Sequence, residues 1–265
     1  WQLFYVNIHL YFYKYINRED MFNYQGDNRI ENNDVYPYIY LKMFVEGIKE
    51  EADVKHVVID EMQDYTPIQY AIINKLYKCN KTILGDFYQS VNPYNLNTLD
   101  ILCGLFKNSK VIELNKSYRS SYEIINFAKR IKDCTIEPLE RHGEEPKIIK
   151  CSDIDDEINK IKIQIDRFKE SDYSNLGIIC KTEKVVEEIH SHLSKSYEVN
   201  VLDKSSTKFI TGVTITTASM SKGLEFDEVI IPKVNNASYR SEYDRSLLYI
   251  ACTRAMHRLT LTYSG

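Results

Sequence analysis

Short apolar runs rich in valine and isoleucine recur along this 265-residue chain, with helix-forming segments between them. Runs of this kind are typical of strands that are buried on both faces of a sheet. Strands that alternate with helices favour a parallel, doubly wound α/β sheet, because parallel neighbours need a crossover connection. Strands are expected at residues 56–59, 82–84, 111–114, 147–149, 176–180, 197–202, 213–217, 228–231 and 258–262.

The intervening segments carry helical spacing and capping residues. Asp34 is expected to cap a helix whose first turn contains Pro37, and Thr182 is expected to cap another. Helices are expected at residues 34–49, 67–77, 121–132, 153–169, 182–194 and 243–255, and in the Tyr-, Asn- and Phe-rich first 33 residues. The chain is long enough for two α/β units.

The composition narrows the class of protein. A hydrophobic fraction of 43% and a charged fraction of 27% are those of a soluble globular protein. The net charge of −4 gives no support for a dedicated nucleic-acid module, although a local groove can hold a backbone on an acidic protein. The six cysteines lack metal-binding spacing and are expected to be buried free thiols. Without a transmembrane run or a signal peptide, we expect a cytoplasmic protein with no membrane partner.

An acidic pair follows the first predicted strand, and ligands in such folds bind at the carboxyl ends of strands. Asp60 and Glu61 come directly after residues 56–59. One carboxylate can hold a hydrated Mg²⁺ whose other ligands are substrate phosphates, and its neighbour can orient or deprotonate a water. A solvated acidic turn is the alternative interpretation.

Four more polar blocks follow in order, at residues 85–90, 114–120, 221–227 and 248–255. Gln89 carries an amide suited to sensing a phosphate or its attacking water. Arg119 and Arg254 carry planar guanidinium groups that match phosphate oxygens. Gly223 would let the backbone approach a nucleotide closely. The plain alternatives are a turn-stabilising side chain for Gln89 and surface salt bridges for the arginines.

Together with residues 60–64, these blocks resemble motifs II to VI of the superfamily 1 helicases of the UvrD, Rep and PcrA type. The resemblance implies a P-loop NTPase with two RecA-like units, each a parallel sheet flanked by helices, of which the first is incomplete. Residues 1–113 would be the C-terminal part of the first unit with accessory helices, and residues 114–265 the second. ATP and Mg²⁺ are the implied ligands, with Asp60 on the metal and Glu61 on the attacking water.

Other roles come from the resemblance alone. Tyr118 matches the residue that stacks on adenine, and Glu225 matches a ribose contact. Tyr94 stands where relatives carry an aromatic residue that stacks on single-stranded DNA, a contact that tolerates any base sequence. Ser219 lies in the stretch where relatives usually carry a histidine that contacts DNA.

The sequence also departs from this family. No glycine is followed by lysine, so the phosphate-binding pattern Gly-x-x-x-x-Gly-Lys-Ser/Thr is absent. We therefore expect that motif to lie upstream of Trp1, and no ATPase activity from this chain alone. The interval between Arg119 and Lys222 leaves little room for the large accessory domain of UvrD and PcrA.

Three functions remain open on the sequence. The first is a motor that couples ATP hydrolysis to movement on single-stranded DNA. The second is a HelD-like factor that binds and recycles RNA polymerase with ATP as a conformational switch, because residues 60–69 and 239–248 resemble that group. The negative net charge and Ser219 favour this factor, whereas Tyr94 favours the motor. The third is a degenerate motor kept as a scaffold, against which the intact Asp60 and Glu61 speak.

Overall fold

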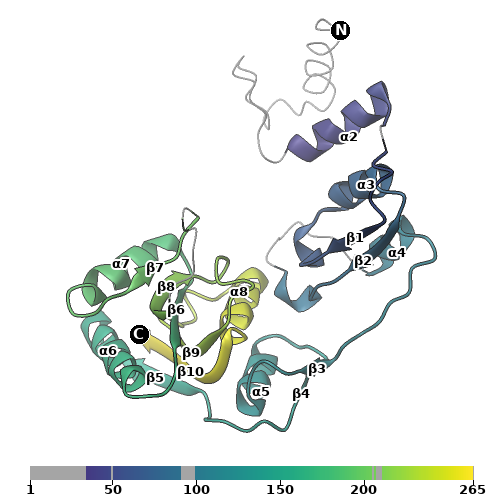
Figure 1. Cartoon of the computed structure of the whole chain (residues 1–265). Coiled ribbons are helices and arrows are strands. Elements are labelled where there is room, and N and C mark those ends of the chain that lie inside the picture. Colours follow the sequence, from purple (N-terminus) through teal and green to yellow (C-terminus); the bar gives the residue numbers. More distant parts are fainter. Residues whose placement is uncertain (1–33, 49, 91–98, 205, 207–210, 265) are drawn as a thin grey trace, which may run out of the picture. The chain divides into compact units, whose positions relative to one another are not determined.

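The structure is a computed structural model that describes residues 34–48, 50–90, 99–204, 206 and 211–264 (Figure 1). The chain forms two compact units. The first contains the described residues up to Phe87 and those from Leu99 to Val111. The second contains residues 88–90 and the described residues from Ile112 onward. The helices predicted in the first 33 residues lie outside the described ranges.

The first unit is built on a two-stranded parallel sheet, in which Ile59 lies opposite Ile83. The strand and helix predictions at residues 56–59, 67–77 and 82–84 are confirmed to within two residues. The helix predicted at residues 34–49 forms but ends at Glu46. The elements are α2 (Val35–Glu46), β1 (His56–Ile59), η1 (Met62–Asp64), α3 (Pro67–Leu76), β2 (Asn80–Ile83) and α4 (Leu99–Leu105), and η2 (Phe87–Gln89) crosses into the second unit.

One face of this small sheet is exposed, so the prediction of burial on both faces is wrong here. Val58 is 63% exposed and Leu84, just past β2, is 48% exposed. Side chains alternate along a strand, so Val57 and Ile59 pack on the small core while Val58 faces away from it. An apolar run therefore does not reveal whether a second layer covers it.

The strand predicted at residues 111–114 does not form. In the structure this stretch is neither strand nor helix, and Ile112 and Leu114 are 71% and 90% exposed. A β-branched run becomes a strand only where a neighbour pairs with its backbone, and no described strand does so. A short pair forms just beyond it, β3 (Lys116–Ser117) with β4 (Glu137–Pro138).

The second unit is a six-stranded, wholly parallel sheet with helices on both faces (Figure 1). Helices α6 (Ile154–Lys169) and α7 (Glu183–Leu193) pack on one face, and α5 (Tyr122–Ile131) and α8 (Glu242–Cys252) on the other. The strand order is β5 (Lys147–Cys151), β10 (Ala255–Ser264), β9 (Phe226–Ile231), β6 (Asn175–Cys180), β8 (Gly212–Thr217) and β7 (Asn200–Val201). This confirms the predicted α/β fold, with the strand expected at residues 197–202 reduced to β7.

Local capping explains where the helices of the second unit begin. Asp153 accepts a hydrogen bond from the backbone N–H of Asp156, and Ser241 accepts one from that of Asp244. The predicted Thr182 cap is confirmed, because its Oγ1 accepts from Val185 N at 3.4 Å. Such caps satisfy N–H groups that the first turn leaves without partners. Among the described helices, none is long and apolar enough to cross a membrane.

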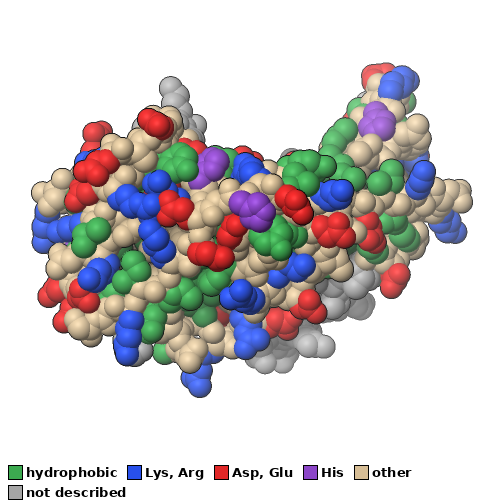
Figure 2. All heavy atoms as spheres, turned by 90° about the horizontal axis from the view of Figure 1, so that it is seen from below, with side chains coloured by type: hydrophobic (Ala, Val, Ile, Leu, Met, Phe, Trp, Pro, Cys, Tyr) green, Lys and Arg blue, Asp and Glu red, His purple; other side chains and the backbone are tan. Residues whose placement is uncertain are grey.

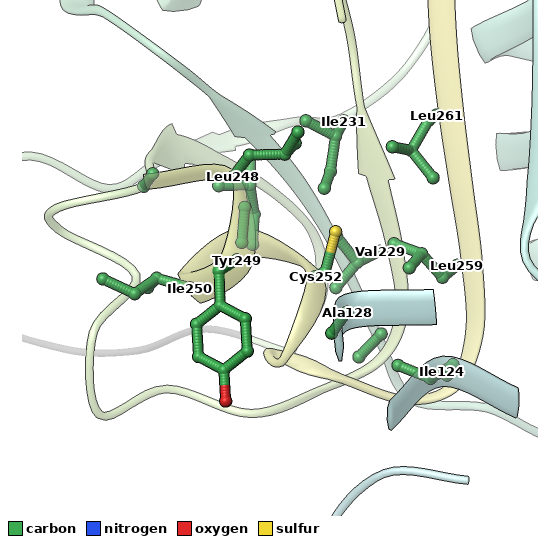
Figure 3. Close-up of a cluster of buried hydrophobic side chains, with 14 of the residues drawn as sticks. Ile124, Ala128, Val229, Ile231, Leu248, Tyr249, Ile250, Cys252, Leu259 and Leu261 are labelled. Carbon is green, nitrogen blue, oxygen red and sulfur yellow. The ribbon is translucent and has the colours of Figure 1, made fainter. Parts of the chain in front are cut away.

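Two apolar clusters hold the second unit together, one on each face of the sheet. Under α5 and α8, Tyr249 and Cys252 pack with Val229 and Leu259 from the sheet (Figure 3). Under α6 and α7, the cluster centres on residues such as Ile178, which is fully buried. The covered sheet therefore provides a rigid platform for the loops at its edges.

The cysteines divide between the two units. All six are free thiols, as predicted, and four of them lie buried in the second unit. Burial raises the pKa of the thiols of Cys180 and Cys252. The first unit holds Cys79, which is partly buried, and Cys103, which is exposed. The prediction of buried thiols is therefore wrong for Cys103.

Candidate functional site

The two predicted catalytic carboxylates lie at the carboxyl end of β1. Asp60 is exposed, and its Oδ1 accepts a hydrogen bond from Glu61 N at 2.8 Å. Glu61 is partly buried and has a left-handed backbone, with φ 51° and ψ 48°. Few residues other than glycine adopt this conformation, and where it persists its surroundings enforce it.

A buried amide links the acidic loop to the loop that follows β2. Gln63 is fully buried; its Nε2 donates to Glu61 Oε2 at 2.5 Å, and its Oε1 accepts from Asp86 N at 3.0 Å. Met62 N also donates to Leu84 O at 2.9 Å. The first two of the five blocks therefore meet at one edge of the sheet. Gln63 lies within the block at residues 60–64, and no role is predicted for it from the sequence.

In the second unit, two predicted ligand contacts pair with each other. Arg119 Nη2 lies 2.7 Å from Glu225 Oε1, and both side chains are partly exposed, 39% and 45%. The sequence assigned Arg119 to a phosphate and Glu225 to a ribose. The structure brings the two side chains together from separate blocks, as an exposed ion pair, which is the plain alternative predicted for Arg119.

Arg254 is 1% exposed, so the alternative of a surface salt bridge is wrong for this residue. Its Nη2 donates to Gln89 Oε1 at 2.7 Å, a contact within the second unit. Its Nε donates to Ile250 O at 3.3 Å, and its Nη1 donates to Leu224 O at 3.4 Å. Leu224 adjoins Glu225, so this arginine connects three of the five blocks.

The remaining predicted residues are placed as follows. Tyr118 is 71% exposed, so its ring is accessible for stacking. Gly223 has φ 79°, which favours glycine at this position. Ser219 is exposed, and its Oγ lies 3.2 Å from Thr217 Oγ1. Tyr94 lies outside the described residues.

Sequence reasoning missed two basic residues that hold site backbone in place. Arg141 Nη2 donates to Met256 O at 3.0 Å and also to the carbonyl of Arg119. Lys132 Nζ donates to the carbonyl of Tyr88, next to Gln89, at 3.0 Å. Both stand outside the five blocks and bind main-chain oxygens, so no motif signals them.

The donor set of the acidic loop fits a magnesium ion that brings most of its own ligands. Within the described ranges, no group of three or more His, Cys, Asp or Glu side chains could hold a metal alone. Mg²⁺ bound with a nucleotide needs only one or two protein carboxylates, because waters and phosphates complete its octahedron. An exposed carboxylate at a strand end, such as Asp60, meets that requirement.

An apolar cavity lies elsewhere in the second unit. It has a volume of about 630 Å³ and is lined by α5, α8, β5, β10 and the loop after β9. Its walls include Phe127, Ile131, Ile148 and Leu261. None of the predicted site residues lines it. The candidate chemistry therefore depends on the strand-end loops.

Two family models match this chain, one in each half. The UvrD/REP helicase N-terminal domain matches residues 45–110, which contain the acidic loop and Gln89. The UvrD-like helicase C-terminal domain matches residues 212–262, which contain Glu225 and Arg254. With the parallel α/β fold, these matches support a superfamily 1 helicase.

Helicases are also among its individual relatives. The chain is 25% identical over 272 residues to the putative ATP-dependent DNA helicase R568 of Acanthamoeba polyphaga mimivirus, covering 88% of this chain and 39% of that protein. It is 33% identical over 84 residues to the ATP-dependent DNA helicase srs2 of Schizosaccharomyces pombe, covering 30% of this chain and 10% of the relative. It is 30% identical over 99 residues to the ATP-dependent DNA helicase Rep of Buchnera aphidicola, covering 36% of this chain and 15% of the relative.

A solved structure is similar as well, the C-terminal domain of a possible DNA helicase from Lactobacillus plantarum. The identity is 29% over 56% of this chain and 88% of that chain, with a TM-score of 0.49. The chain spans 39% or less of the length of each of the three relatives above.

Proposed function

We propose that this chain is part of an ATP-dependent superfamily 1 DNA helicase or translocase, in which ATP hydrolysis drives movement along single-stranded DNA. The observation that carries the proposal is the convergence of separate blocks in the second unit. Arg254 contacts Gln89, 165 positions earlier, and Arg119 contacts Glu225. Arginine and glutamine are residue types that bind and sense phosphate groups, and Glu225 would contact the ribose.

Each side chain has a defined task in this proposal. Glu61 orients the attacking water and takes its proton. Arg119 and Arg254 bind the oxygens on which negative charge develops, a role that can be worth on the order of 10³–10⁵ in rate. Tyr118 stacks on the base. Mg²⁺, held through Asp60, would neutralise phosphate charge.

The present partners of the two arginines suit exchange for a nucleotide. Arg254 Nη2 donates to a neutral amide oxygen, and a hydrogen bond to a phosphate would be stronger because both groups are charged. Arg119 is partly exposed, so its contact with Glu225 is screened by water and weak. We therefore propose that nucleotide binding displaces both contacts.

The principal test is Glu61→Gln in the full-length protein. We expect the kcat of ATP hydrolysis to fall on the order of 10²–10⁴-fold, the range for loss of a general base, while nucleotide affinity stays within about twofold. Steady-state ATPase with saturating single-stranded DNA and equilibrium binding of a fluorescent ATP analogue measure the two quantities. Glu51→Gln, at an exposed carboxylate of the same unit, is the control. A wild-type protein without DNA-stimulated ATPase would contradict the proposal.

The 265-residue chain itself is proposed to lack ATPase activity. Its sequence contains no Gly-Lys pair, so it has no P-loop of the usual pattern to hold the β- and γ-phosphates. Turnover by the purified chain, abolished by Glu61→Gln, would show this to be wrong.

The HelD-like recycling factor stays a second prediction, because Ser219 is exposed where relatives carry a DNA-contacting histidine. Co-purification of the full-length protein with RNA polymerase distinguishes the recycling factor from the motor. Polymerase binding with no DNA stimulation of ATPase would favour the recycling factor. Strong DNA stimulation without polymerase binding would exclude it.

A further inference from the structure

We propose that Gln63 is a positioning residue that fixes the carboxylate of Glu61 for catalysis and ties it to the loop after β2. The inference rests on the proposed function, because it takes Glu61 as the residue that activates water. Gln63 is fully buried, so its amide would lose free energy if either half lacked a partner. Both halves have partners, and one of them is Glu61.

The direction of these hydrogen bonds is settled by chemistry. The backbone N–H of Asp86 can only donate, so the atom of Gln63 that faces it at 3.0 Å must be the carbonyl oxygen. The amide nitrogen is then left facing Glu61 Oε2 at 2.5 Å, where an ionised carboxylate can only accept. Gln63 therefore holds the carboxylate of Glu61 in one orientation.

The backbone of the loop is held as firmly as the side chain. Glu61 has the uncommon left-handed conformation. The next residue is fixed on both sides, because Met62 N donates to Leu84 O at 2.9 Å and Tyr70 Oη donates to Met62 O at 2.7 Å. A loop held in this way presents Glu61 without a search through other conformations, as preorganised catalysis requires.

Gly85 makes the close approach of the two loops possible. A Cβ at this position would lie 2.6 Å from Met62 N and would also overlap the side chain of Gln63. The loop that leads to Gln89 can therefore contact the acidic loop directly. The hydrogen bond between Gln63 and Asp86 N would be enough to join the two loops. The hydrogen bond from Gln63 to the carboxylate of Glu61 is the one that points to a positioning role.

The kinetic test compares two substitutions of Gln63 in the full-length protein with saturating single-stranded DNA. Gln63→Glu keeps an acceptor for Asp86 N but places a second carboxylate against Glu61. Gln63→Met removes the hydrogen bonds to both Asp86 and Glu61. We expect each to lower kcat on the order of 10–100-fold, the usual effect of removing a side chain that orients an active group. The KM for ATP should stay within about twofold.

Gln69→Glu is the matched control. Gln69 belongs to the same unit, and its Oε1 only accepts, from Thr66 N at 2.6 Å and from Thr66 Oγ1 at 2.8 Å. A carboxylate can replace that acceptor, so kcat should be unchanged. Wild-type kcat in both Gln63 variants, or a rise in KM that accounts for the whole loss, would overturn the positioning role.

A second measurement tests the contact without any ATPase. In the 265-residue chain, Gln63→Glu should lower the melting temperature, and adding Glu61→Gln should restore it, because the reversed pair again joins a donor to an acceptor. In the full-length protein the double variant should still turn over as slowly as Glu61→Gln. Failure of the second substitution to restore the melting temperature would refute the Gln63–Glu61 contact. Absence of DNA-stimulated ATPase in the wild type would instead refute the proposed function.

Discussion

The two units of this chain place their candidate residues by different physical means. In the second unit, a six-stranded sheet is covered on both faces, and Arg254, which directly precedes β10, is buried. In the first unit, two strands carry a small core, and Val58 on one face is 63% exposed. Glu61 is held there by hydrogen bonds around a strained loop. The candidate residues of the second unit therefore stand on a sheet that apolar packing covers, whereas those of the first depend on a polar network beside a small core.

The largest expected difference between the two units is in how much free energy of unfolding is lost when an apolar side chain of the sheet is truncated. Ile178→Ala should lower the free energy of unfolding by about 2–5 kcal/mol, because it opens a cavity in a covered sheet. Val58→Ala should change it by less than about 0.5 kcal/mol, because that side chain is mostly in water. Urea unfolding of the 265-residue chain measures both. Equal effects would mean that the two sheets are covered alike.

The second prediction concerns the buried arginine. Arg254→Met should lower the free energy of unfolding by about 1–3 kcal/mol, because it leaves Gln89 Oε1 and Leu224 O without this donor. Arg119→Met removes an exposed guanidinium and should change stability by less than about 1 kcal/mol. The same urea titration compares the two variants. A larger loss of stability in Arg119→Met than in Arg254→Met would contradict this difference between the two arginines.

The third prediction concerns Tyr118, whose ring is 71% exposed. In the full-length protein, Tyr118→Ala should weaken nucleotide binding by about 0.5–1.5 kcal/mol, the range for an aromatic contact, and Tyr118→Phe should not. The melting temperature should stay unchanged in both, because the ring packs on little else. A fluorescent ATP analogue measures the affinity. Loss of affinity in Tyr118→Phe would point to the hydroxyl group instead of the ring.

The smallest effect is expected from an ion-pair network of the second unit. A hydrogen bond from Arg167 at 2.5 Å is the main cause that lowers the pKa of Glu144 from 4.5 to about 2. A lowered pKa in the folded state means that this pair stabilises the fold above about pH 4.5. Its contribution should disappear as the pH falls toward 2.

Because Glu144 is 40% exposed, solvent screens the pair and the contribution should stay below about 1 kcal/mol. Glu144→Gln should remove this part of the pH dependence of unfolding, measured in urea between pH 2 and 6. Glu145→Gln, at the exposed neighbouring position, should leave it intact. The same curve in both variants would show that Glu144 makes no such contribution.

The sequence predicted strands well in the region where strands and helices alternate regularly, because each strand there has a neighbouring strand to pair with. The strands at residues 176–180 and 213–217 became central strands of the parallel sheet. The run at residues 111–114 is also short and mostly apolar, but it does not form a strand, because its backbone has no neighbouring strand among the described residues. The spacing of hydrophobic residues shows which side chains a segment can bury. It does not show whether another strand or helix is present to pack against them.

The candidate site divides in the same way. The positions of Asp60 and Glu61 after β1, and of Gln89 after β2, followed from the rule that ligands gather at strand ends. The burial of Arg254 did not follow, because two of its partners, the carbonyl of Leu224 and the amide of Gln89, come from distant blocks. The contacts of Gln63 could not be predicted either, because one of its partners, Asp86, lies in the loop after β2.

The surface in view carries charges of both signs without a broad basic field. Figure 2 shows Lys and Arg side chains interspersed with Asp and Glu across the face in view, in keeping with the net charge of −4. A broad basic field would attract any polyanion.

The distribution of thiols has a practical consequence for following this protein in solution. Maleimide dyes react with the thiolate, and burial keeps Cys180 and Cys252 protonated and out of reach. Cys103 is exposed, so a dye added in limited amount should attach there first and leave the large sheet unmodified. The natural chain thus carries a reporter position in its smaller part, and fluorescence can follow that part without any engineered cysteine.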